Sequence, residues 1–269
     1  MRLQVLLSAM NLSDESYIDT LNISGDALIV NQCDKEDVKS IERVSKDRGK
    51  LQRVKYIETK QRGLSKSRNM AIEESDSEVC ILCDNDVEYL PDYESKVLEA
   101  FDKHADADLI VFYIKRKEKP FPNYSKSKRM GYFSVLKIFS PEIAFKRESI
   151  RGIRFDERFG AGSGKYIMGE ENIFLYDCLK KGLKIYYEPI MIAELREEES
   201  TWFKGYDERF FISRGAGYAA MSPWFSYILI GQFALRKKDL YIKEMSVRDA
   251  LKYMLSGRRE VIKQDNNTR

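Results

Sequence analysis

The chain has 269 residues, of which 43% are hydrophobic and 33% are charged, and this composition excludes an intrinsically disordered protein. Its 46 basic and 43 acidic residues give a net charge of +3, which excludes nucleic-acid binding through bulk charge. The first residues lead directly into the apolar segment 3–7, without the pattern of a secretory signal. We therefore expect a cytoplasmic protein with one large catalytic domain and an appendage.

The first half of the chain alternates short apolar runs with amphipathic stretches. Strands are predicted at 3–8, 27–31, 54–59, 79–83 and 109–113, and helices at 15–21, 36–46, 66–74 and 92–103. This alternation is typical of parallel strands joined by crossover helices. The sequence therefore predicts an α/β nucleotide-binding architecture.

Two features that often indicate metal or redox chemistry have a structural interpretation here. Cys80 and Cys83 form a C-x-x-C inside the predicted strand 79–83, and no second C-x-x-C completes a zinc site. We expect both to be buried structural cysteines. His104, the only histidine, follows the predicted helix 92–103, and we expect it at the surface.

Polar residues follow three of the predicted strands, at 8–11, 31–34 and 84–86. Each group could be a simple turn, because Asn and Asp favour turns. Their joint occurrence favours a ligand site, because ligands of such sheets bind beyond the carboxyl ends of the strands. We expect Asp84 and Asp86 to project to the same side of an extended chain, where two carboxylates suit Mg²⁺ or Mn²⁺ and a diphosphate.

Two helix starts add further candidates. Gly63–Asn69 (G-L-S-K-S-R-N) leads into a helix with Ser65 as its expected N-cap, which would offer backbone donors to an anion; the alternative is a surface helix with Lys66 and Arg68 in water. Glu170 and Glu171 follow the glycine-rich loop 160–164 and fall in the first turn of a helix that ends before Gly182. They either complement the helix dipole or supply a general base.

In their order, these motifs resemble the family 2 inverting glycosyltransferases of the GT-A fold, particularly bacterial enzymes of capsular and other surface polysaccharides. The resemblance covers about residues 1–200 and includes G-L-S-K-S-R-N, D-N-D, F-D-E-R-F-G and G-E-E-N. It implies a Rossmann-like mixed sheet flanked by helices, with a helical C-terminal tail. The implied domains are a catalytic domain at 1–205, with a nucleotide-sugar half at 1–115 and an acceptor half at 116–205, and a helical segment at 206–269.

The same resemblance implies roles for individual residues. Asp86 would bind the Mn²⁺ or Mg²⁺ ion directly, and Asp84 would hold the ribose or the ion. Glu171 occupies the place of the catalytic base, although the family usually has aspartate there, so Glu170 is a second candidate. The residues expected at the donor are Ser8, Asn11, Asp34, Arg68, Asp84, Asn85 and Asp86.

The implied reaction is a metal-dependent hexosyl transfer from a nucleotide sugar, expected to be a UDP-sugar, to a glycan or lipid-linked saccharide with inversion. A metal-dependent nucleotidyltransferase and a catalytically silent sugar-nucleotide or glycan-binding protein are the alternatives.

The tail contains an uncharged stretch at 216–235, flanked by Arg214 and by Arg236, Lys237 and Lys238. Pro223 and Gly231 argue against a simple membrane span, so peripheral contact with an anionic membrane or packing in the core is expected.

A basic stretch at 115–129 has Phe121 and Tyr124 interleaved. It is interpreted as a solvated loop or as a surface for anionic lipid or a lipid diphosphate, at the inner face of the cell membrane.

Overall fold

The computed structural model describes residues 1–45, 49–117, 119–196, 203 and 205–268. The chain folds into two compact units that are interleaved along the sequence. The sheet unit comprises Met1–Arg62, Lys66–Arg154 and Cys178–Glu198, and the helical unit comprises Gly63–Ser65, Phe155–Asp177 and Glu199–Arg269. The expected catalytic and C-terminal domains, divided at residue 205, remain a prediction.

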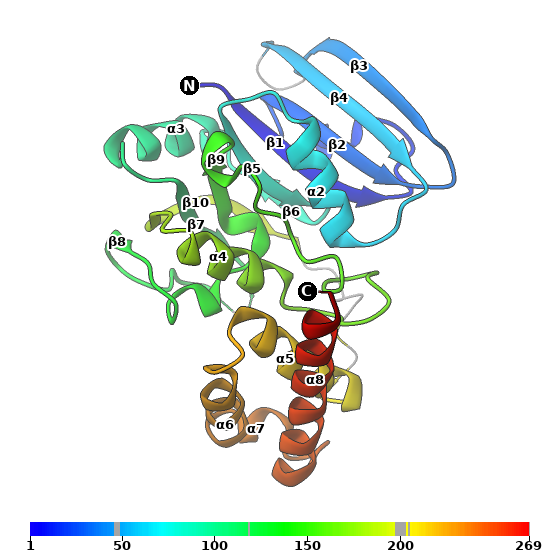
Figure 1. Ribbon diagram of the computed structural model, residues 1–269. Helices are drawn as coiled ribbons and strands as arrows, with labels where there is room; N and C mark the ends of the chain where they lie inside the picture. The colour runs from blue at the N-terminus through cyan, green and yellow to red at the C-terminus, as the bar shows by residue number, and fades with distance from the viewer. Residues whose placement is uncertain (46–48, 118, 197–202, 204, 269) are drawn as a thin grey trace. The chain divides into compact units, whose positions relative to one another are not determined.

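The sheet unit is built on one mixed sheet with the strand order β3-β4-β2-β1-β5-β9-β7-β10-β6, and β8 pairs with β10 (Figure 1). Strands β4, β2, β1 and β5 run parallel, whereas β3 and β9 are antiparallel to their neighbours. The strands are β1 (Leu3–Met10), β2 (Asp26–Gln32), β3 (Asp37–Val44), β4 (Leu51–Thr59), β5 (Val79–Asp84), β6 (Val87–Tyr89), β7 (Leu109–Lys115), β8 (Lys128–Arg129), β9 (Ile143–Lys146) and β10 (Ile185–Leu195). The predicted strands at 3–8, 27–31, 54–59, 79–83 and 109–113 are therefore confirmed.

Helices cover both faces of the central strands. Alternate residues of β1 face opposite sides: Leu7 packs in the apolar core with α1 and α3, whereas Gln4 and Ser8 accept hydrogen bonds from Ser75 and Ser67 of the α2 segment. The helices are α1 (Tyr17–Thr20), α2 (Leu64–Glu74), α3 (Tyr93–Lys103), α4 (Glu170–Lys180), α5 (Glu208–Met221), α6 (Ser226–Arg236), α7 (Lys238–Tyr241) and α8 (Val247–Thr268), with 3-10 helices η1 (Val135–Lys137), η2 (Ser140–Glu142) and η3 (Glu148–Ile150).

The segment 36–46, which is predicted to be helical, instead contains the edge strand β3, so this prediction is wrong. β3 pairs antiparallel with β4 over its whole length, from Asp37 opposite Glu58 to Val44 opposite Leu51. The i, i+3 spacing of Val38, Ile41 and Val44 fits a helix in isolation, but the neighbouring strand satisfies the backbone of the extended form. The predicted helix at 15–21 is reduced to Tyr17–Thr20.

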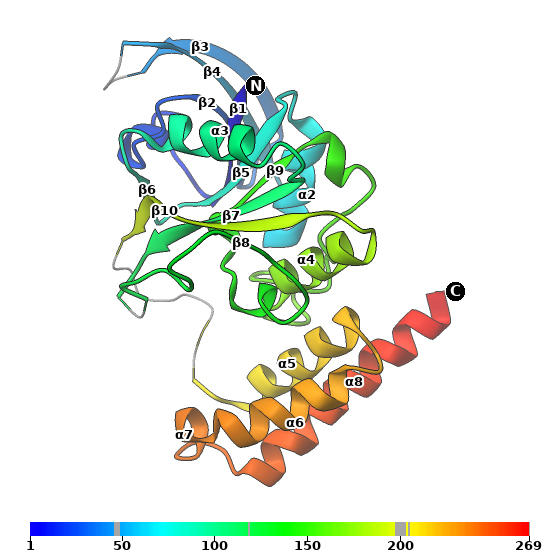
Figure 2. The ribbon, with the colours of Figure 1, turned by 90° about the vertical axis from the view of Figure 1, so that its left-hand side faces the viewer.

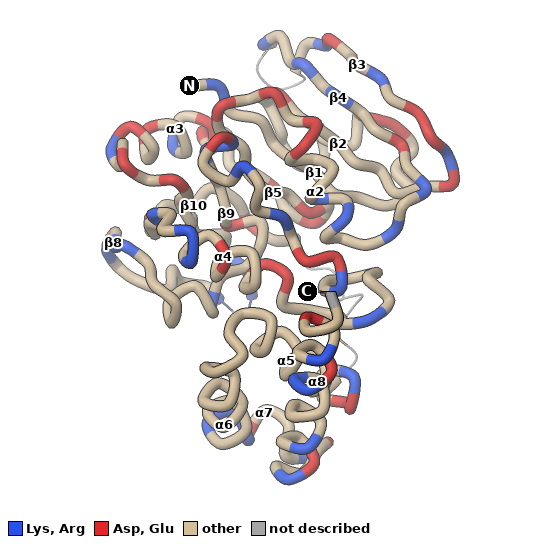
Figure 3. Tube along the Cα trace, viewed as in Figure 1, with Lys and Arg blue, Asp and Glu red and all other residues tan. Residues whose placement is uncertain are grey.

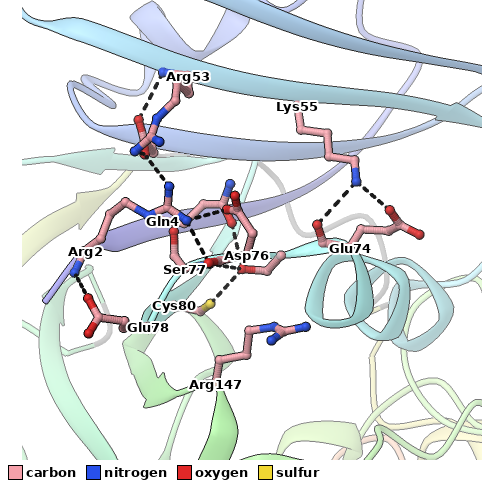
Figure 4. Close-up of polar contacts among 12 residues, drawn as sticks. Arg2, Gln4, Arg53, Lys55, Glu74, Asp76, Ser77, Glu78, Cys80 and Arg147 are labelled. Carbon is pink, nitrogen blue, oxygen red and sulfur yellow. Dashed lines mark hydrogen bonds and ion pairs between the residues drawn. The ribbon is translucent and has the colours of Figure 1, made fainter.

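Charged and polar side chains pair with one another at the amino-terminal end of the central strands (Figure 4). Arg2 lies 2.7 Å from Asp76, and Arg53 lies 2.6 Å from Asp26. These pairs are partly exposed, so water and salt screen them and each contributes little to stability. The end of the sheet where ligands are expected is the opposite one, where β1, β2 and β5 finish.

The cysteine prediction is confirmed. Cys80 and Cys83 are free and buried in β5. The Cys80 sulfur lies 3.1 Å from the Ser75 hydroxyl, and burial raises the pKa of Cys80 to about 11. Burial also raises the pKa of Cys83, so neither thiol is activated as a nucleophile.

His104, which was expected at the surface, is half-buried because it contacts the buried carboxylate of Glu188.

In the helical unit, α5, α6 and α8 lie side by side (Figure 2). Asp207 caps α5 by accepting a hydrogen bond from the Phe210 amide at 2.8 Å. The segment 216–235 is divided between α5 and α6, and Ala216, Tyr218 and Met221 are buried, which confirms core packing for its first part. Within the part of the chain that the structure describes, no helix combines the length and apolar character needed to cross a membrane.

Candidate functional site

The carboxyl end of β5 is the centre of the candidate donor site. Asp84 is the last residue of β5 and stands opposite Ser8 in the register of β1 and β5. Ser8 is buried, and its hydroxyl accepts a hydrogen bond from Ser67 at 2.9 Å. Asn11 is exposed in a left-handed conformation with φ of 52° just after β1. The sheet therefore brings Ser8 and Asp84 together, as expected from adjacent parallel strands.

Arg68 extends from α2 to this place and pairs with Asp84. Its Nη2 atom lies 3.0 and 3.2 Å from the two carboxylate oxygens, and only 2% of the Arg68 side chain is exposed. The interpretation of Arg68 as a surface residue in water is therefore wrong, because the guanidinium is desolvated and held by a carboxylate. A buried arginine with donors in a fixed plane is suited to oxygen atoms of a bound ligand.

Asn85 and Asp86 form the turn between β5 and β6, so the chain is not extended through Asp86 as predicted. Two contacts hold this turn: the Tyr17 hydroxyl donates to the Asn85 carbonyl at 2.9 Å, and the Arg196 amide donates to the Asp86 carbonyl at 2.8 Å. Asn85 is exposed, whereas Asp86 is half-buried. The turn places a second acidic side chain two residues after Asp84.

The chemistry of this donor set fits a divalent cation shared with a diphosphate. Mg²⁺ in phosphate-transfer sites binds one or two carboxylates and completes its octahedron with phosphate oxygens and water. Of the two carboxylates, Asp84 is held by the fixed positive charge of Arg68. No cluster of three or more His, Cys, Asp or Glu side chains that could hold a metal occurs among the described residues.

Asp34 follows β2 and is fully accessible to solvent, with 99% of its side chain exposed. Its carboxylate lies 2.7 Å from Arg62 Nη2, and Arg62 also donates to the carbonyl oxygens of Cys33 and Thr59. Arg62 therefore ties the ends of β2 and β4 together and orients Asp34. The sheet unit thus groups Ser8, Arg68 and Asp84, and it places Asp34 at the end of another parallel strand.

A second group of candidate residues lies in the helical unit, around the glycine-rich loop. The Leu64 amide donates to the Ala161 carbonyl at 2.9 Å, and a Cβ atom on Gly63 would lie 3.5 Å from the Gly162 carbonyl oxygen. Gly63, with φ of 119°, allows this close approach of the two segments. Residues 63–65 and 160–164, which are about 100 positions apart, are therefore neighbours.

Ser65 was predicted to cap α2, and this prediction is wrong. The helix begins one residue earlier, at Leu64, and the Ser65 hydroxyl donates to the Phe159 carbonyl at 2.7 Å. Ser65 therefore fastens the helix start to the segment before the glycine-rich loop. The physical reason is position, because a capping oxygen must precede the first helical residue and Ser65 is already the second residue of α2.

Glu170 and Glu171 begin α4, as predicted. Glu170 is 6% exposed, and its carboxylate lies directly beneath the loop, since a Cβ atom on Gly160 would be only 3.1 Å from Glu170 Cδ. Glu171 is half-buried. The two adjacent glutamates therefore have different environments: Glu170 is buried against the loop, and Glu171 is half-buried.

A cavity of about 360 Å³ lies elsewhere in the sheet unit, between α2 and the segment around η3. Its lining includes Asn69, Glu73, Arg147 and Arg151, and none of the residues expected at the donor. Arg154 and Glu73, which both line it, form an ion pair.

Sequence reasoning missed two residues that organise the donor side. Tyr17 carries no sequence signal for its contact with the Asn85 carbonyl, because the two are 68 positions apart. Arg62 could have been found, since a basic residue immediately before Gly63 adds to the positive charge of that motif.

The mixed sheet carries acidic residues at the carboxyl end of β5, and comparison with known proteins identifies the family of the chain. Residues 26–160, which are 135 of the 269, match the model of glycosyl transferase family 2. The chain therefore belongs to this family and is a glycosyltransferase. A search of curated proteins found no match.

Solved structures with the same fold include S. aureus TarS 1-349, with a TM-score of 0.58 and 13% identity over 100% of this chain and 92% of that one. The same TarS segment in complex with UDP-GlcNAc gives a TM-score of 0.58 at 13% identity, covering 100% and 93% of the two chains. The Pyrobaculum calidifontis mannosyltransferase PcManGT, in complex with GDP-Man and Mn²⁺, gives 0.53 at 13% identity, covering 95% and 73%. This chain spans 44% of a longer TarS chain. These likenesses establish the GT-A-like fold.

Proposed function

We propose that the chain is a metal-dependent inverting hexosyltransferase that takes its sugar from a UDP-sugar and transfers it to a glycan or a lipid-linked saccharide. The observation that carries this proposal is the desolvated Arg68–Asp84 pair next to Asp86 at the carboxyl end of β5. Family membership supports sugar transfer, and the neighbours crystallised with UDP-GlcNAc and with GDP-Man and Mn²⁺ support a nucleotide-sugar donor with a divalent cation.

In the proposed donor site, Asp86 would hold Mn²⁺ or Mg²⁺, which would supply positive charge for the donor's diphosphate. Asp84, oriented by Arg68, would bind the ribose or the same ion. Asn85 and the polar residues at the ends of β1 and β2, which are Ser8, Asn11 and Asp34, surround the nucleotide. Arg68 contributes fixed positive charge, which stabilises the departing nucleoside diphosphate without reorganisation of solvent.

Glu171 is the proposed catalytic base, which removes the proton of the acceptor hydroxyl while the configuration at the anomeric carbon of the sugar inverts. The different burial of the two glutamates supports this assignment. Glu170 is packed beneath Gly160 beside Ser65 and is proposed to position the glycine-rich loop, whereas Glu171 is only half-buried. Asymmetry of this kind allows neighbouring carboxylates to have separate tasks.

We further propose that the enzyme acts in bacterial surface or capsular polysaccharide biosynthesis, in the cytoplasm at the inner face of the membrane. The basic segment 115–129 supports an anionic acceptor. Phe121 is 76% exposed there, and Lys128 lies over the ring of Tyr124 at 4.2 Å. Exposed aromatic rings with interspersed cations suit a saccharide carried on a lipid diphosphate.

The test is transfer by the purified full chain with added Mn²⁺ and a panel of nucleotide sugars. We expect Mn²⁺-dependent thermal stabilisation by one donor, and release of its nucleoside diphosphate. Asp86→Ala and Glu171→Gln should each reduce turnover at least ~100-fold. Glu170→Gln should reduce it less and should lower the melting temperature.

Asp102→Asn and Glu99→Gln provide matched controls, because both residues are exposed carboxylates on α3. They should turn over normally. Normal turnover by folded Asp86→Ala or Glu171→Gln contradicts the role of that residue. Release of pyrophosphate would identify a nucleotidyltransferase instead, and donor binding without hydrolysis or transfer would identify a silent binding protein.

A further inference from the structure

Helix α6 carries apolar side chains on two opposite faces. One face packs inside the helical unit and consists of residues that are at most 2% exposed: Ser226, Leu229, Ile230 and Ala234. The other face is in solvent: Tyr227, Ile228 and Leu235 are 54%, 60% and 65% exposed, and Trp224 in the preceding turn is 87% exposed. At 3.6 residues per turn, positions 227, 228 and 235 fall within an arc of about 100°. We name these four exposed residues the α6 stripe.

Such a helix is unusual in a chain surrounded only by water. A surface helix normally has one apolar side and one charged side. A helix that is apolar on all sides is normally buried, so that none of its sides faces water. Arg236 is the only charged residue within α6. Eleven residues span about 16 Å, roughly half of a bilayer's hydrocarbon core, so α6 is long enough to lie on a membrane and too short to cross it.

The charges that follow the α6 stripe are mainly positive. Residues 236–243 contain four basic side chains, all exposed, against one acidic side chain, Asp239. The next acid, Glu244, accepts a hydrogen bond from the Tyr206 amide at 2.7 Å. Figure 3 shows basic residues near the end of α6, where it leads into α7. The basic residues are Arg236, Lys237, Lys238 and Lys243.

Arg214, which the sequence suggested as a membrane-facing flank, has a different role. Its guanidinium lies 5.2 Å from the ring centre of Phe210 and 5.0 Å from that of Phe233. It is therefore part of an internal aromatic cluster. The exposed basic side chains that follow the α6 stripe in the chain are Arg236, Lys237, Lys238 and Lys243.

The start of the α6 stripe is held rigidly. Arg258 of α8 donates to the Ser226 hydroxyl at 2.9 Å and to the Pro223 carbonyl at 3.0 Å. The same guanidinium lies 3.6 Å from the ring centre of Tyr227. The turn that carries Trp224 is thus ordered before any partner binds, which lowers the entropic cost of docking.

We propose that the α6 stripe docks into the interface of an anionic lipid membrane, with the basic residues 236–238 and 243 on the phospholipid head groups. Aromatic and aliphatic side chains on one helix face, followed by a basic cluster, form the pattern of an interfacial helix. A second copy of the chain would present the same positive cluster and would leave it uncompensated. This inference rests on the proposed location at the inner membrane face and specifies the surface responsible for it.

The first test is flotation of the full chain with vesicles, without donor or metal. We expect binding to phosphatidylcholine vesicles that contain about one third phosphatidylglycerol, and little binding to phosphatidylcholine alone. Lys237→Gln/Lys238→Gln should weaken binding ~30-fold, and Ile228→Ser/Leu235→Ser on the order of 100-fold. Val44→Ser/Leu51→Ser is the matched control, since these aliphatic residues are 62% and 67% exposed on β3 and β4.

The second test uses the fluorescence of Trp224. The chain has two tryptophans, so Trp202→Phe leaves Trp224 as the only one. Its emission should shift to shorter wavelength with anionic vesicles and should be quenched by brominated lipid. An unchanged emission, or Ile228→Ser/Leu235→Ser protein that floats like the wild type, overturns the proposal.

Sedimentation of the same variants separates a membrane from a second copy. If the wild type is a dimer that Ile228→Ser/Leu235→Ser dissociates, and neither protein binds vesicles, the stripe joins two chains and the proposal is wrong. The vesicle experiments use no nucleotide sugar, so membrane binding and sugar transfer are measured independently. A protein that floats with vesicles but releases no nucleoside diphosphate refutes only the proposed enzyme. A protein that releases nucleoside diphosphate but does not float refutes only the docking surface.

Discussion

The crossing of α5 and α8 allows a sharp prediction about stability, because two glycines let the helices meet at backbone distance. A Cβ atom on Gly215 would lie 1.9 Å from the Met254 carbonyl oxygen, and one on Gly257 would lie 2.0 Å from the Ile212 carbonyl oxygen. Both obstacles are backbone, so the helices themselves must separate by more than about 1 Å to restore van der Waals contact. Overpacking of this kind costs about 1–3 kcal/mol or more. Gly215→Ala and Gly257→Ala should each lower the melting temperature by about 3–10 °C.

Gly231→Ala is the matched control for these variants. Gly231 is also inside a helix, but a Cβ atom there would meet no atom within 4 Å. Alanine has the higher helix propensity, so this variant should be stabilised by about 0.5–1 kcal/mol. Circular dichroism at 222 nm during heating gives the melting temperature of each of the three variants, and urea titration gives its free energy of unfolding. A Gly215→Ala protein that melts within a degree of the wild type would refute the close helix contact.

Two further variants test charged groups that are removed from water. Arg68→Met leaves the partly buried Asp84 without its guanidinium partner, and we expect the free energy of unfolding to fall by about 1–3 kcal/mol in urea titration, together with weaker donor binding by calorimetry. At Glu188, burial by itself raises the pKa, but hydrogen bonds from Ser127, Lys103 and His104 outweigh it, so the pKa lies below the ordinary 4.5. The carboxylate therefore stabilises the fold above pH 4.5 and loses this contribution as the pH falls below it. The difference in unfolding free energy between wild type and Glu188→Gln should accordingly shrink on acidification, and a constant difference from pH 7 to pH 3 would contradict the carboxylate's role.

Much of the fold was predictable because its central strands are locally distinctive. Runs such as Leu3–Leu7 and Val79–Cys83 are apolar, short and bounded by polar residues, so their periodicity and their ends agree with the strands that form. The segment 36–46 was not predictable in this way. Its hydrophobic spacing suits a helix, and only the pairing of β3 with β4 shows that it is extended. An edge strand forms its ladder hydrogen bonds with one neighbouring strand, which no local window contains.

The candidate site shows the same limit at the level of single residues. The acidic turn at 84–86 and the glutamates that begin α4 follow recognisable elements, so sequence reasoning located them. Their environments were not accessible from the sequence. Arg68 could equally have been a solvated residue on a surface helix, and burial against Asp84 decides otherwise.

The sequence by itself determined the family, the order of the motifs that follow the parallel strands and the residue types available for chemistry, because these depend on short motifs and their order along the chain. Tertiary structure alone decided that Glu170 is buried next to Gly160 while Glu171 is half-buried, and that α6 has a second apolar face in solvent. The physical reason is that burial and ion pairing are properties of contacts between distant segments. A side chain's charge, pKa and access to a partner depend on those contacts as much as on its own chemistry.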